Sequence, residues 1–404
     1  MAFRFLHTAD LHLDSPLRSL ALRDGDLAAL IAGATRHALR AIVDLALSEQ
    51  LDAVLIAGDL YDGSQTSMKT ARFLSGQLAR LDQAGIRVFI IRGNHDAESQ
   101  ITRELTLPPS VHVFASRAGV ERIDTPSLRV AIHGLSFRDR HAPESLLPKY
   151  RAPVEGAVNI GMMHTSLNGA AGHDPYAPCT LAELQGSGFD YWALGHIHKR
   201  AVYPGAPMVV MPGIPQGRHM GETGAGSVTL VSIDDGGGVE LQERVVAEAE
   251  FARLDVDLSD LAEWSDWRAA VQSALEHAPR ATPHLVARLS LRGQTPLAVR
   301  LLREGDLALA EAQDIAQALG GVWVEKLVLD FGGPPPLHGE LAALAELIDS
   351  DIRPSDGYTA ALDEIRASLQ AALPPELRKA FDCLVDAQIT QGVAQVLAQL
   401  GGRG

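Results

Sequence analysis

The sequence has few cysteines and no long apolar run, and these absences exclude several classes of protein. Its only cysteines, Cys179 and Cys383, lie far apart. They form neither a disulfide framework nor a zinc knuckle, so a reducing compartment is expected. No stretch approaches the roughly 18 apolar residues of a membrane span, and the opening residues lack the basic and apolar segments of a secretory signal. We therefore predict a cytoplasmic protein that does not span a membrane.

Basic residues are also in the minority. Lys and Arg total 35 against 50 Asp and Glu, which gives a formal net charge of −15. A protein that binds nucleic acid mainly by releasing counterions needs a basic face, so tight binding of that kind is not expected. The charge does not exclude catalysis on a phosphate ester, because bound divalent ions can supply the local positive charge.

The chain is long enough, at 404 residues with 46% hydrophobic, for two or three cores. Its first part alternates apolar strands with amphipathic helices, which is the pattern of an α/β fold with parallel strands. The expected elements are strands at 3–8, 53–57, 87–91, 128–133, 158–163 and 191–194, helices at 26–49 and 67–84, and an antiparallel hairpin at 227–233 and 239–245. The hairpin is expected to close a first domain, 1–248.

The rest of the chain has a different pattern. A small α+β domain is expected over 249–331, with helices at 261–277 and 307–319 and strands at 284–291 and 322–329. A Gly-Gly-Pro-Pro-Pro segment at 332–336 reads as a stiff linker. The part from 340 onward is helical, so 332–404 is expected to be a linker followed by a helical tail.

Side chains of the kinds that bind metal ions follow five of the expected strands. They are Asp10 and His12 after the first strand, Asp59 after the second, Asn94 and His95 after the third, His164 after the strand at 158–163, and His196 and His198 after the strand at 191–194. The carboxyl ends of strands in an open α/β sheet converge on one ligand crevice. We therefore expect these side chains to meet at one edge.

Seven of these side chains, all except His95, offer oxygen or nitrogen donors and no thiolate, which suits two divalent cations. The predicted division is Asp10, His12 and His198 on one ion, Asn94, His164 and His196 on the other, and Asp59 as the bridge. Two ions roughly 3.5–4 Å apart lower the pKa of a shared water and stabilise an in-line displacement at phosphorus. The sequence therefore predicts a two-metal phosphoesterase.

Two residues beside the ligands are candidates for catalytic roles. His95 adjoins Asn94 and would protonate the leaving oxygen or bind a phosphoryl oxygen. Asp62 follows Asp59 by three residues and would fix the tautomer of His95, as carboxylates do for working histidines.

Each block alone also has a simpler interpretation. Gly58-Asp59 is a common strand-end turn, and His196 and His198 alone would pass for loop histidines. Five blocks in this order, each after an apolar strand, favour the metal site over coincidence.

The remaining histidines and aromatics are assigned to simpler roles. His7 and His133 are expected to be satisfied core groups, His37 and His112 structural or exposed, and the pair Tyr191-Trp192 strand packing rather than a base-stacking platform. His173, Arg218 and His219 lie in loops near the ligands and are candidate substrate contacts.

The ligand blocks carry a resemblance to a known superfamily. The blocks Asp10-x-His12, Gly58-Asp59-x-x-Asp62, Gly93-Asn94-His95-Asp96, Met163-His164 and Gly195-His196-x-His198 resemble those of the calcineurin-like metallophosphoesterases. The longer stretches 7–16, 172–179, 191–198 and 215–219 are similar to SbcD-type DNA repair exonucleases, particularly the YhaO group. Asp62 stands where some relatives have a second histidine, and Ile214 stands where a polar residue is expected.

The resemblance implies a two-sheet sandwich flanked by helices, followed by a small α+β capping domain and a helical C-terminal tail. It implies two divalent ions, with manganese preferred and magnesium, iron or zinc as alternatives. The implied activity is hydrolysis of phosphodiester bonds at DNA ends in repair. The implied partners are DNA, a coiled-coil ATPase of the SbcC or SMC type docked by the C-terminal region, and a second copy of the chain, with the early helices as candidate interface.

Three functions remain open on the sequence. The first is an exonuclease, with endonuclease activity on single strands as an extension. The second is a phosphodiesterase or phosphatase of small molecules, which has no obvious use for the expected cap and tail at 249–404. The third is a scaffold with a vestigial metal site, against which the complete ligand set counts.

Overall fold

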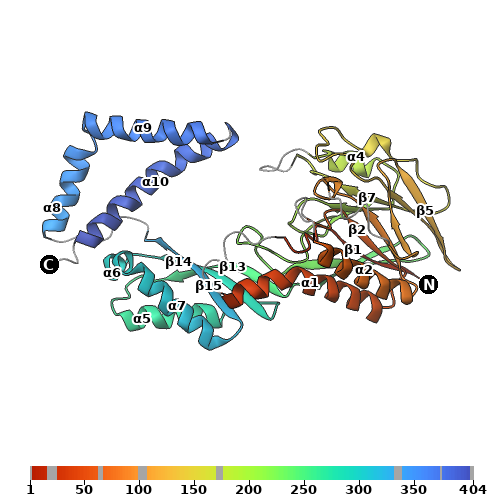
Figure 1. Cartoon of the computed structure of the whole chain (residues 1–404), viewed down its shortest axis with the longest axis horizontal. Coiled ribbons are helices and arrows are strands. Elements are labelled where there is room, and N and C mark those ends of the chain that lie inside the picture. Colours follow the sequence, from red (N-terminus) through yellow and green to blue (C-terminus); the bar gives the residue numbers. More distant parts are fainter. Residues whose placement is uncertain are drawn as a thin grey trace. The chain divides into compact units, whose positions relative to one another are not determined.

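The computed structural model describes residues 2–15, 25–61, 67–98, 107–169, 176–331, 339–373 and 375–400 (Figure 1). They form two compact units. The first contains Met1–Ala252 and Arg280–Val286, and the second contains Arg253–Pro279 and Ala287–Gly404. The domain bounds expected from the sequence remain a prediction.

The first unit contains two six-stranded sheets. One has the order β12-β11-β1-β2-β3-β4, formed by Val239–Val245, Ser227–Ile233, Phe3–Thr8, Ala53–Ala57, Arg87–Ile91 and Val111–Val113. The other has the order β5-β6-β7-β8-β10-β9, formed by Gly119–Asp124, Arg129–Gly134, Val158–His164, Tyr191–Gly195, Met208–Met211 and Ala201–Tyr203. Both sheets mix parallel and antiparallel pairs, and the expected α/β sandwich is confirmed.

The strands that carry the expected ligands are parallel neighbours. In the first sheet β1 pairs with β2 and β2 with β3 in parallel, and in the second β7 pairs with β8 so that His164 lies opposite Gly195. The loops that follow these strands therefore leave from the same ends of the sheets. The loop after β1 also pairs with the loop after β2, since the Asp10 amide donates to the Gly58 carbonyl at 2.9 Å.

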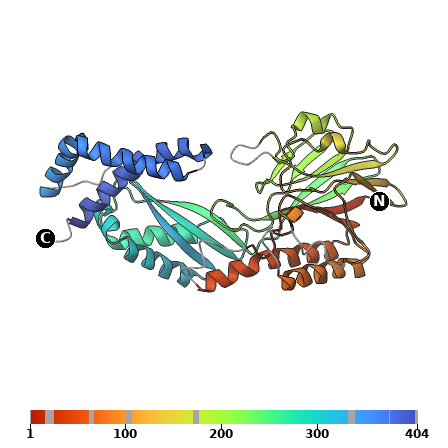
Figure 2. The ribbon, with the colours of Figure 1, turned by 45° about the horizontal axis from the view of Figure 1, so that its top comes forward.

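The core of this unit has layers on both faces of the first sheet. Phe5, Leu55 and Phe89 face the second sheet and pack against Ile160 and Tyr191 there. Their alternate neighbours face the helices α1 (Gly25–Ser48) and α2 (Met68–Gln83), which cover the opposite face (Figure 2). Helix α1 buries Leu27, Ile31, Ala34, Ala38 and Ile42, the spacing that the sequence predicts for an amphipathic helix.

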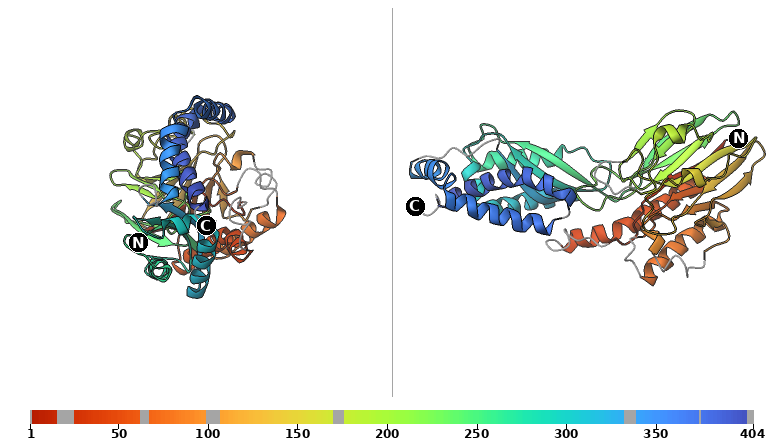
Figure 3. Two further views of the ribbon diagram at one scale, coloured as in Figure 1. Left: turned by 90° about the vertical axis from the view of Figure 1, so that its left-hand side faces the viewer. Right: turned by 90° about the horizontal axis from the view of Figure 1, so that it is seen from above.

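The second unit contains most of the sheet β13-β14-β15, whose strands are Ala249–Asp257, His284–Arg292 and Val322–Asp330; the first residues of β13 and β14 belong to the first unit. Helix α5 (Trp264–Glu276) packs against α7 (Gly305–Leu319), and α7 against β15. The chain continues through α8 (Glu340–Leu347), a π-helical turn (Ile348–Ile352), α9 (Asp356–Ala372) and α10 (Pro375–Leu400), drawn in blue in Figure 3. Helix α10 returns to contact α6 (Ala298–Arg303) and α8.

The expected secondary structure differs from the observed structure mainly at short elements. Strands β4, β5, β9, β10 and β13, the short helix α4 (Leu181–Gln185) and helix α6 were not expected. Arg280–Val286, which the sequence assigns to the second domain, belongs to the first unit. The reason is local, because the buried Glu250 carboxylate accepts the amides of Ala281 and Thr282 at 2.7 and 3.3 Å. Among the described residues, no helix is long and apolar enough to cross a membrane.

Candidate metal centre

Several expected ligands lie on strained backbone. Asp10, His12, Asp59 and His196 have φ angles of +54°, +41°, +55° and +101°. Positive φ is uncommon for residues other than glycine and is concentrated at functional sites, where the surrounding structure maintains it. All four residues are buried, so the loops after β1, β2 and β8 hold these side chains in fixed positions.

One group of donors consists of Asp10, His12 and His198, with one ligand atom from each within 4.8 Å of the others. The Nε2 atoms of His12 and His198 lie 3.2 Å apart, and His198 Nε2 lies 4.0 Å from Asp10 Oδ1. This group corresponds to the three ligands predicted for the first ion.

A second group consists of Asp10, Asp59 and His164. His164 Nε2 lies 3.4 Å from Asp59 Oδ2 and 3.0 Å from the Oδ1 atom of Asn94. On its other side, His164 Nδ1 bonds to the Ala57 carbonyl at 2.9 Å, which requires a proton on Nδ1 and leaves Nε2 to face the acids.

Asp59 and Asp10 both lie close to donors of the two groups. Asp59 Oδ2 is 3.8 Å from His12 and 3.4 Å from His164, so it lies between one histidine of each predicted ion. The two groups share Asp10, whose carboxylate accepts the His196 amide at 3.0 Å. The His196 ring lies outside both groups, with its centroid 5.1 Å from that of His164. The assignment of Asp59 as the bridge remains a prediction.

The electrostatics of these residues suit a cation. Burial raises the pKa of Asp59, but His164, with His12 and His95, outweighs burial and holds it well below its usual range. Burial lowers the pKa of His164, but the Asp59 and Asp10 carboxylates outweigh it and raise this pKa to about 9. The ionised Asp59 carboxylate therefore lies among imidazole nitrogens in a buried space, and carboxylate oxygens and imidazole nitrogens are donors that divalent ions bind.

His95 lies at the edge of this cluster and is only half-buried. Its amide donates to Asp59 Oδ1 at 3.1 Å, and its ring centroid lies 5.1 Å from that of His12. It is therefore near both groups of donors, as a proton donor to the leaving oxygen would need to be. Asp62 and His173 lie outside the described residues, so their roles remain predictions.

Two acids to which the sequence analysis gave no role support the proposed ligands. Asp96 is buried and accepts the amides of Gly93 and Tyr61 at 3.1 and 3.2 Å, which fixes the turn that carries Asn94. Burial, and then the charge of Asp59, raise its pKa to about 7. Glu222 contacts His198 at 2.7 Å. In the sequence, Asp96 could have been recognised because it adjoins the block Asn94-His95. Glu222 could have been recognised because it follows Arg218 by four residues in the same loop.

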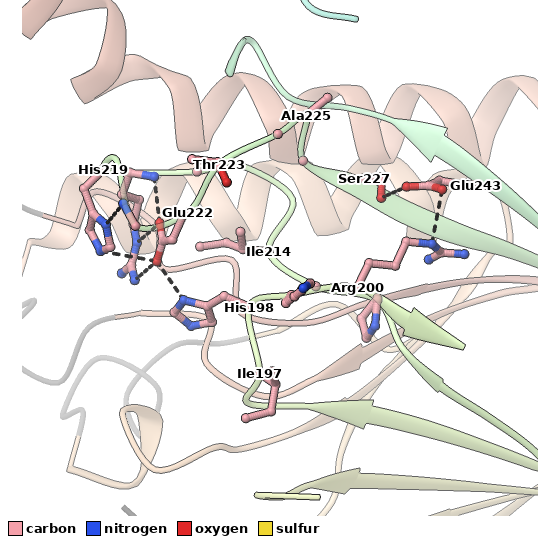
Figure 4. Close-up of a pocket in the computed structure, with 18 residues that line it drawn as sticks. Ile197, His198, Arg200, Ile214, His219, Glu222, Thr223, Ala225, Ser227 and Glu243 are labelled. Atoms are coloured by element: carbon pink, nitrogen blue, oxygen red, sulfur yellow. Dashed lines mark hydrogen bonds and ion pairs between the residues drawn. The ribbon is translucent and has the colours of Figure 1, made fainter. Parts of the chain in front are cut away.

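The candidate substrate contacts Arg218 and His219 both contact Glu222, the carboxylate that bonds to His198. The Arg218 guanidinium bonds to Glu222 at 2.8 Å, and His219 Nε2 lies 3.6 Å from the same carboxylate. A cavity of about 760 Å³ borders His198, and the exposed Lys199 and the buried Ile214 line it (Figure 4). The Ile214 amide donates to the His198 carbonyl at 3.0 Å, so Ile214 helps to hold the ligand loop.

The simpler assignments agree with the structure with one exception. His7 is buried and bonds to Tyr191 Oη and to the Leu194 carbonyl, and Trp192 is fully buried. The side chains of His37 and His112 are 48% and 39% exposed. His133 bonds to Asn159 through Nε2, but its buried Nδ1 has no hydrogen-bond partner among the described residues, so it is only partly satisfied.

Comparison with known proteins identifies the class. Residues 3–200 match the family model of the calcineurin-like phosphoesterases, and 251–332 match that of the middle domain of the metallophosphoesterase YhaO. With the two donor groups, these matches define a metal-dependent phosphodiester hydrolase. The chain is 35% identical over 295 residues to the uncharacterized metallophosphoesterase YhaO of Bacillus subtilis (strain 168), covering 72% of each chain. It belongs to the YhaO family of metallophosphoesterases.

More distant relatives are DNA double-strand break repair proteins Mre11. That of Sulfurisphaera tokodaii is 26% identical over 218 residues, which are 52% of this chain and 54% of the relative. That of Methanocaldococcus jannaschii is 27% identical over 202 residues, 48% of this chain and 51% of the relative. The chain thus matches only about half the length of these relatives.

Among solved structures, a dimetal phosphatase from Danio rerio matches over 60% of this chain and 99% of its own, with 15% identity and a TM-score of 0.38.

Proposed function

We propose that this protein is a manganese-dependent nuclease that hydrolyses phosphodiester bonds of DNA in repair, acting on ends as an exonuclease. The observation that carries the proposal is the pair of donor groups around Asp10, Asp59 and His164. Two divalent ions held there would activate a water and neutralise charge on the phosphoryl oxygens. The DNA substrate is supported by the similarity to the Mre11 repair proteins.

The chain's own residues have distinct proposed roles. Asp10, His12 and His198 would hold one ion, Asn94, His164 and His196 would hold the other, and Asp59 would contribute to both. The Ala57 carbonyl keeps the His164 proton on Nδ1, so that Nε2 faces Asn94 and the Asp59 carboxylate. His95 donates a proton to the leaving oxygen, and Asp62 fixes its tautomer.

The proposal of a protein partner is supported by apolar residues exposed on the second unit. Helix α9 exposes Ile365 and Leu369, whose side chains are 57% and 48% exposed, and these residues are four apart and so share one helix face. Leu347 at the end of α8 is 47% exposed. We propose that this apolar surface docks the coiled-coil ATPase of the SbcC type. A homodimer through the early helices is a further part of the proposal.

The discriminating experiment supplies the full chain and manganese with three substrates: linear double-stranded DNA, circular single-stranded DNA and a cyclic nucleotide. Degradation of the linear DNA from its ends is expected, and cleavage of the circle would add endonuclease activity. Asp59→Ala should abolish every activity, whereas His112→Gln, which alters an exposed histidine outside the site, should not. Hydrolysis of the cyclic nucleotide alone would replace the nuclease with a small-molecule phosphodiesterase, and inactivity on all three would favour a scaffold.

A further inference from the structure

The candidate ligand His198 is in contact with a buried carboxylate through its Nδ1 atom. The Glu222 side chain is 5% exposed, and its Oε1 lies 2.7 Å from His198 Nδ1 (Figure 4). On the other side of the ring, Nε2 lies 3.2 Å from His12 Nε2 and 4.0 Å from Asp10. The ring of His198 therefore lies between a carboxylate on one side and the first group of donors on the other.

This contact selects one tautomer of His198. A carboxylate can only accept, so the proton shared with Glu222 belongs to Nδ1. The lone pair of a neutral imidazole then lies on Nε2, the atom that faces His12 and Asp10. Histidines that bind metals in proteins are commonly fixed in this way by a carboxylate on the other ring nitrogen.

Arg218 holds Glu222 in turn. Its guanidinium reaches both carboxylate oxygens, with Nη2 at 2.8 Å from Oε1 and Nε at 3.3 Å from Oε2, and its amide donates to Oε2 at 2.7 Å. Arg218 Nη1 also contacts Ser15 Oγ at 3.3 Å, in the loop that carries His12. Glu222 therefore accepts hydrogen bonds from both His198 and Arg218.

The loop around Arg218 is itself anchored. The buried Gln216 side chain bonds to the backbone of Glu248 and Ala249, which ties the loop to the start of β13. Gly217 approaches the Glu222 carbonyl so closely that a Cβ atom there would lie 2.7 Å from it. The stretch 215–219, singled out in the sequence, thus builds the turn that presents Arg218 to Glu222.

We propose that Glu222, braced by Arg218, is a positioning residue that fixes His198 in the tautomer and orientation required to bind a divalent ion. The inference rests on the proposed role of His198 as a metal ligand. It gives Arg218 a role in metal affinity instead of the substrate contact expected from the sequence. The two roles differ in their effect, because a substrate contact changes KM at saturating metal and a brace changes the affinity for the metal itself.

The test is isothermal titration calorimetry, in which Mn²⁺ alone is added to the whole chain. The wild type should bind two ions. Glu222→Ala should weaken one of them about ten- to hundred-fold, the usual cost of losing such a partner, and Glu222→Gln and Arg218→Gln should weaken the same ion less. Glu121→Gln, which alters a carboxylate 3.7 Å from an exposed histidine elsewhere, is the matched control and should leave both ions unchanged.

Three further measurements separate the outcomes. His198→Ala should lose one ion; if it binds two as tightly as the wild type, the ligand assignment itself fails. If His198→Ala loses an ion and Glu222→Ala does not, only the positioning role is overturned. Hydrolysis of bis(p-nitrophenyl) phosphate at saturating Mn²⁺ tests Arg218, since a raised KM with unchanged metal affinity would restore the substrate contact. Thermal unfolding in chelator checks folding, and Arg218→Gln, which retains Glu222, carries the test if Glu222→Ala does not fold.

Discussion

At the scale of single residues, the candidate metal centre contains buried histidines that we propose as ligands and one half-buried histidine that we propose as the proton donor. His164 is buried and confined by the Ala57 carbonyl, whereas His95 is half-buried and reaches the site from its edge. A side chain that must contact a substrate needs such access, and a ligand does not. The geometry therefore supports different consequences for removing the two kinds of histidine.

His95→Ala should reduce kcat by about 10²- to 10⁴-fold, the usual contribution of a general acid, while two Mn²⁺ ions remain bound. The manganese that remains bound after gel filtration measures metal occupancy, and hydrolysis of bis(p-nitrophenyl) phosphate measures kcat. A variant that has lost one ion would show that His95 is a ligand.

His7 gives the fold a dependence on pH. Burial lowers the pKa of His7 to about 3, because it outweighs the hydrogen bond to the Leu194 carbonyl, which raises this pKa. The unfolded chain binds a proton at His7 below pH ~6.5 and the folded chain does not, so stability is full above that pH and falls as pH decreases towards 3. The slope attributable to His7 is about 1.4 kcal/mol per pH unit within that window. Urea unfolding in chelator should show a shallower pH dependence for His7→Gln than for the wild type, and parallel curves would contradict the assignment.

At the scale of elements, the site depends on how closely two sheets approach. A Cβ atom on Gly195, at the end of β8, would lie 2.1 Å from the Ala57 carbonyl oxygen and 2.9 Å from His164 Nδ1. These are the two groups whose hydrogen bond fixes the His164 tautomer. Glycine at 195 is therefore required for β2, β7 and β8 to converge on one site.

Gly195→Ala should separate Ala57 from His164, lowering stability by about 1–3 kcal/mol, the usual cost of overpacking, and weakening Mn²⁺ binding. Gly76→Ala in the middle of α2, where an added Cβ meets nothing within 4 Å, is the matched control and should not destabilise the protein. Urea unfolding and metal titration measure both effects. Unchanged metal affinity in Gly195→Ala would mean that the tautomer of His164 is not held by this contact.

The sequence could predict the strands and helices whose apolar residues recur with a clear period, and the candidate ligands that directly follow such strands. Strands β1, β2 and β3 have the expected bounds because each is a buried apolar run, and their donors follow directly. The short strands β4 and β9 have no such run and are defined by their neighbours. Glu222 lies 24 residues from His198, and only the turn around Gly217 brings the two together. Contacts of that kind depend on loop conformation, which no periodicity records.

At the scale of the whole molecule, the C-terminal helices of the second unit differ in their contacts and in the apolar side chains that they expose. Helix α10 packs on α6 and α8, as helices that merely complete the small α+β region would. Helix α9 exposes Ile365 and Leu369, and α10 also exposes Leu384 and Val396. The C-terminal helices therefore provide both a packed base and an apolar surface, and only the latter is proposed to meet a partner.

Truncation after Gly333 should leave hydrolysis of bis(p-nitrophenyl) phosphate intact and abolish association with the ATPase partner. The double variant Ile365→Asp and Leu369→Asp should do the same in the full chain, with Asp363→Lys on the same helix as a control for charge. Co-purification with the ATPase measures association. Equal binding by the truncated protein would place the docking surface elsewhere.

The central claim is that two divalent ions share one carboxylate in this site, and a crystal structure of the protein soaked in manganese tests it most directly. Anomalous difference maps should show two peaks roughly 3.5–4 Å apart. Asp59 should lie between them, with Asp10, His12 and His198 on one ion and Asn94, His164 and His196 on the other. A single peak, or two ions bridged by Asp10 with Asp59 bound to only one, would contradict the account.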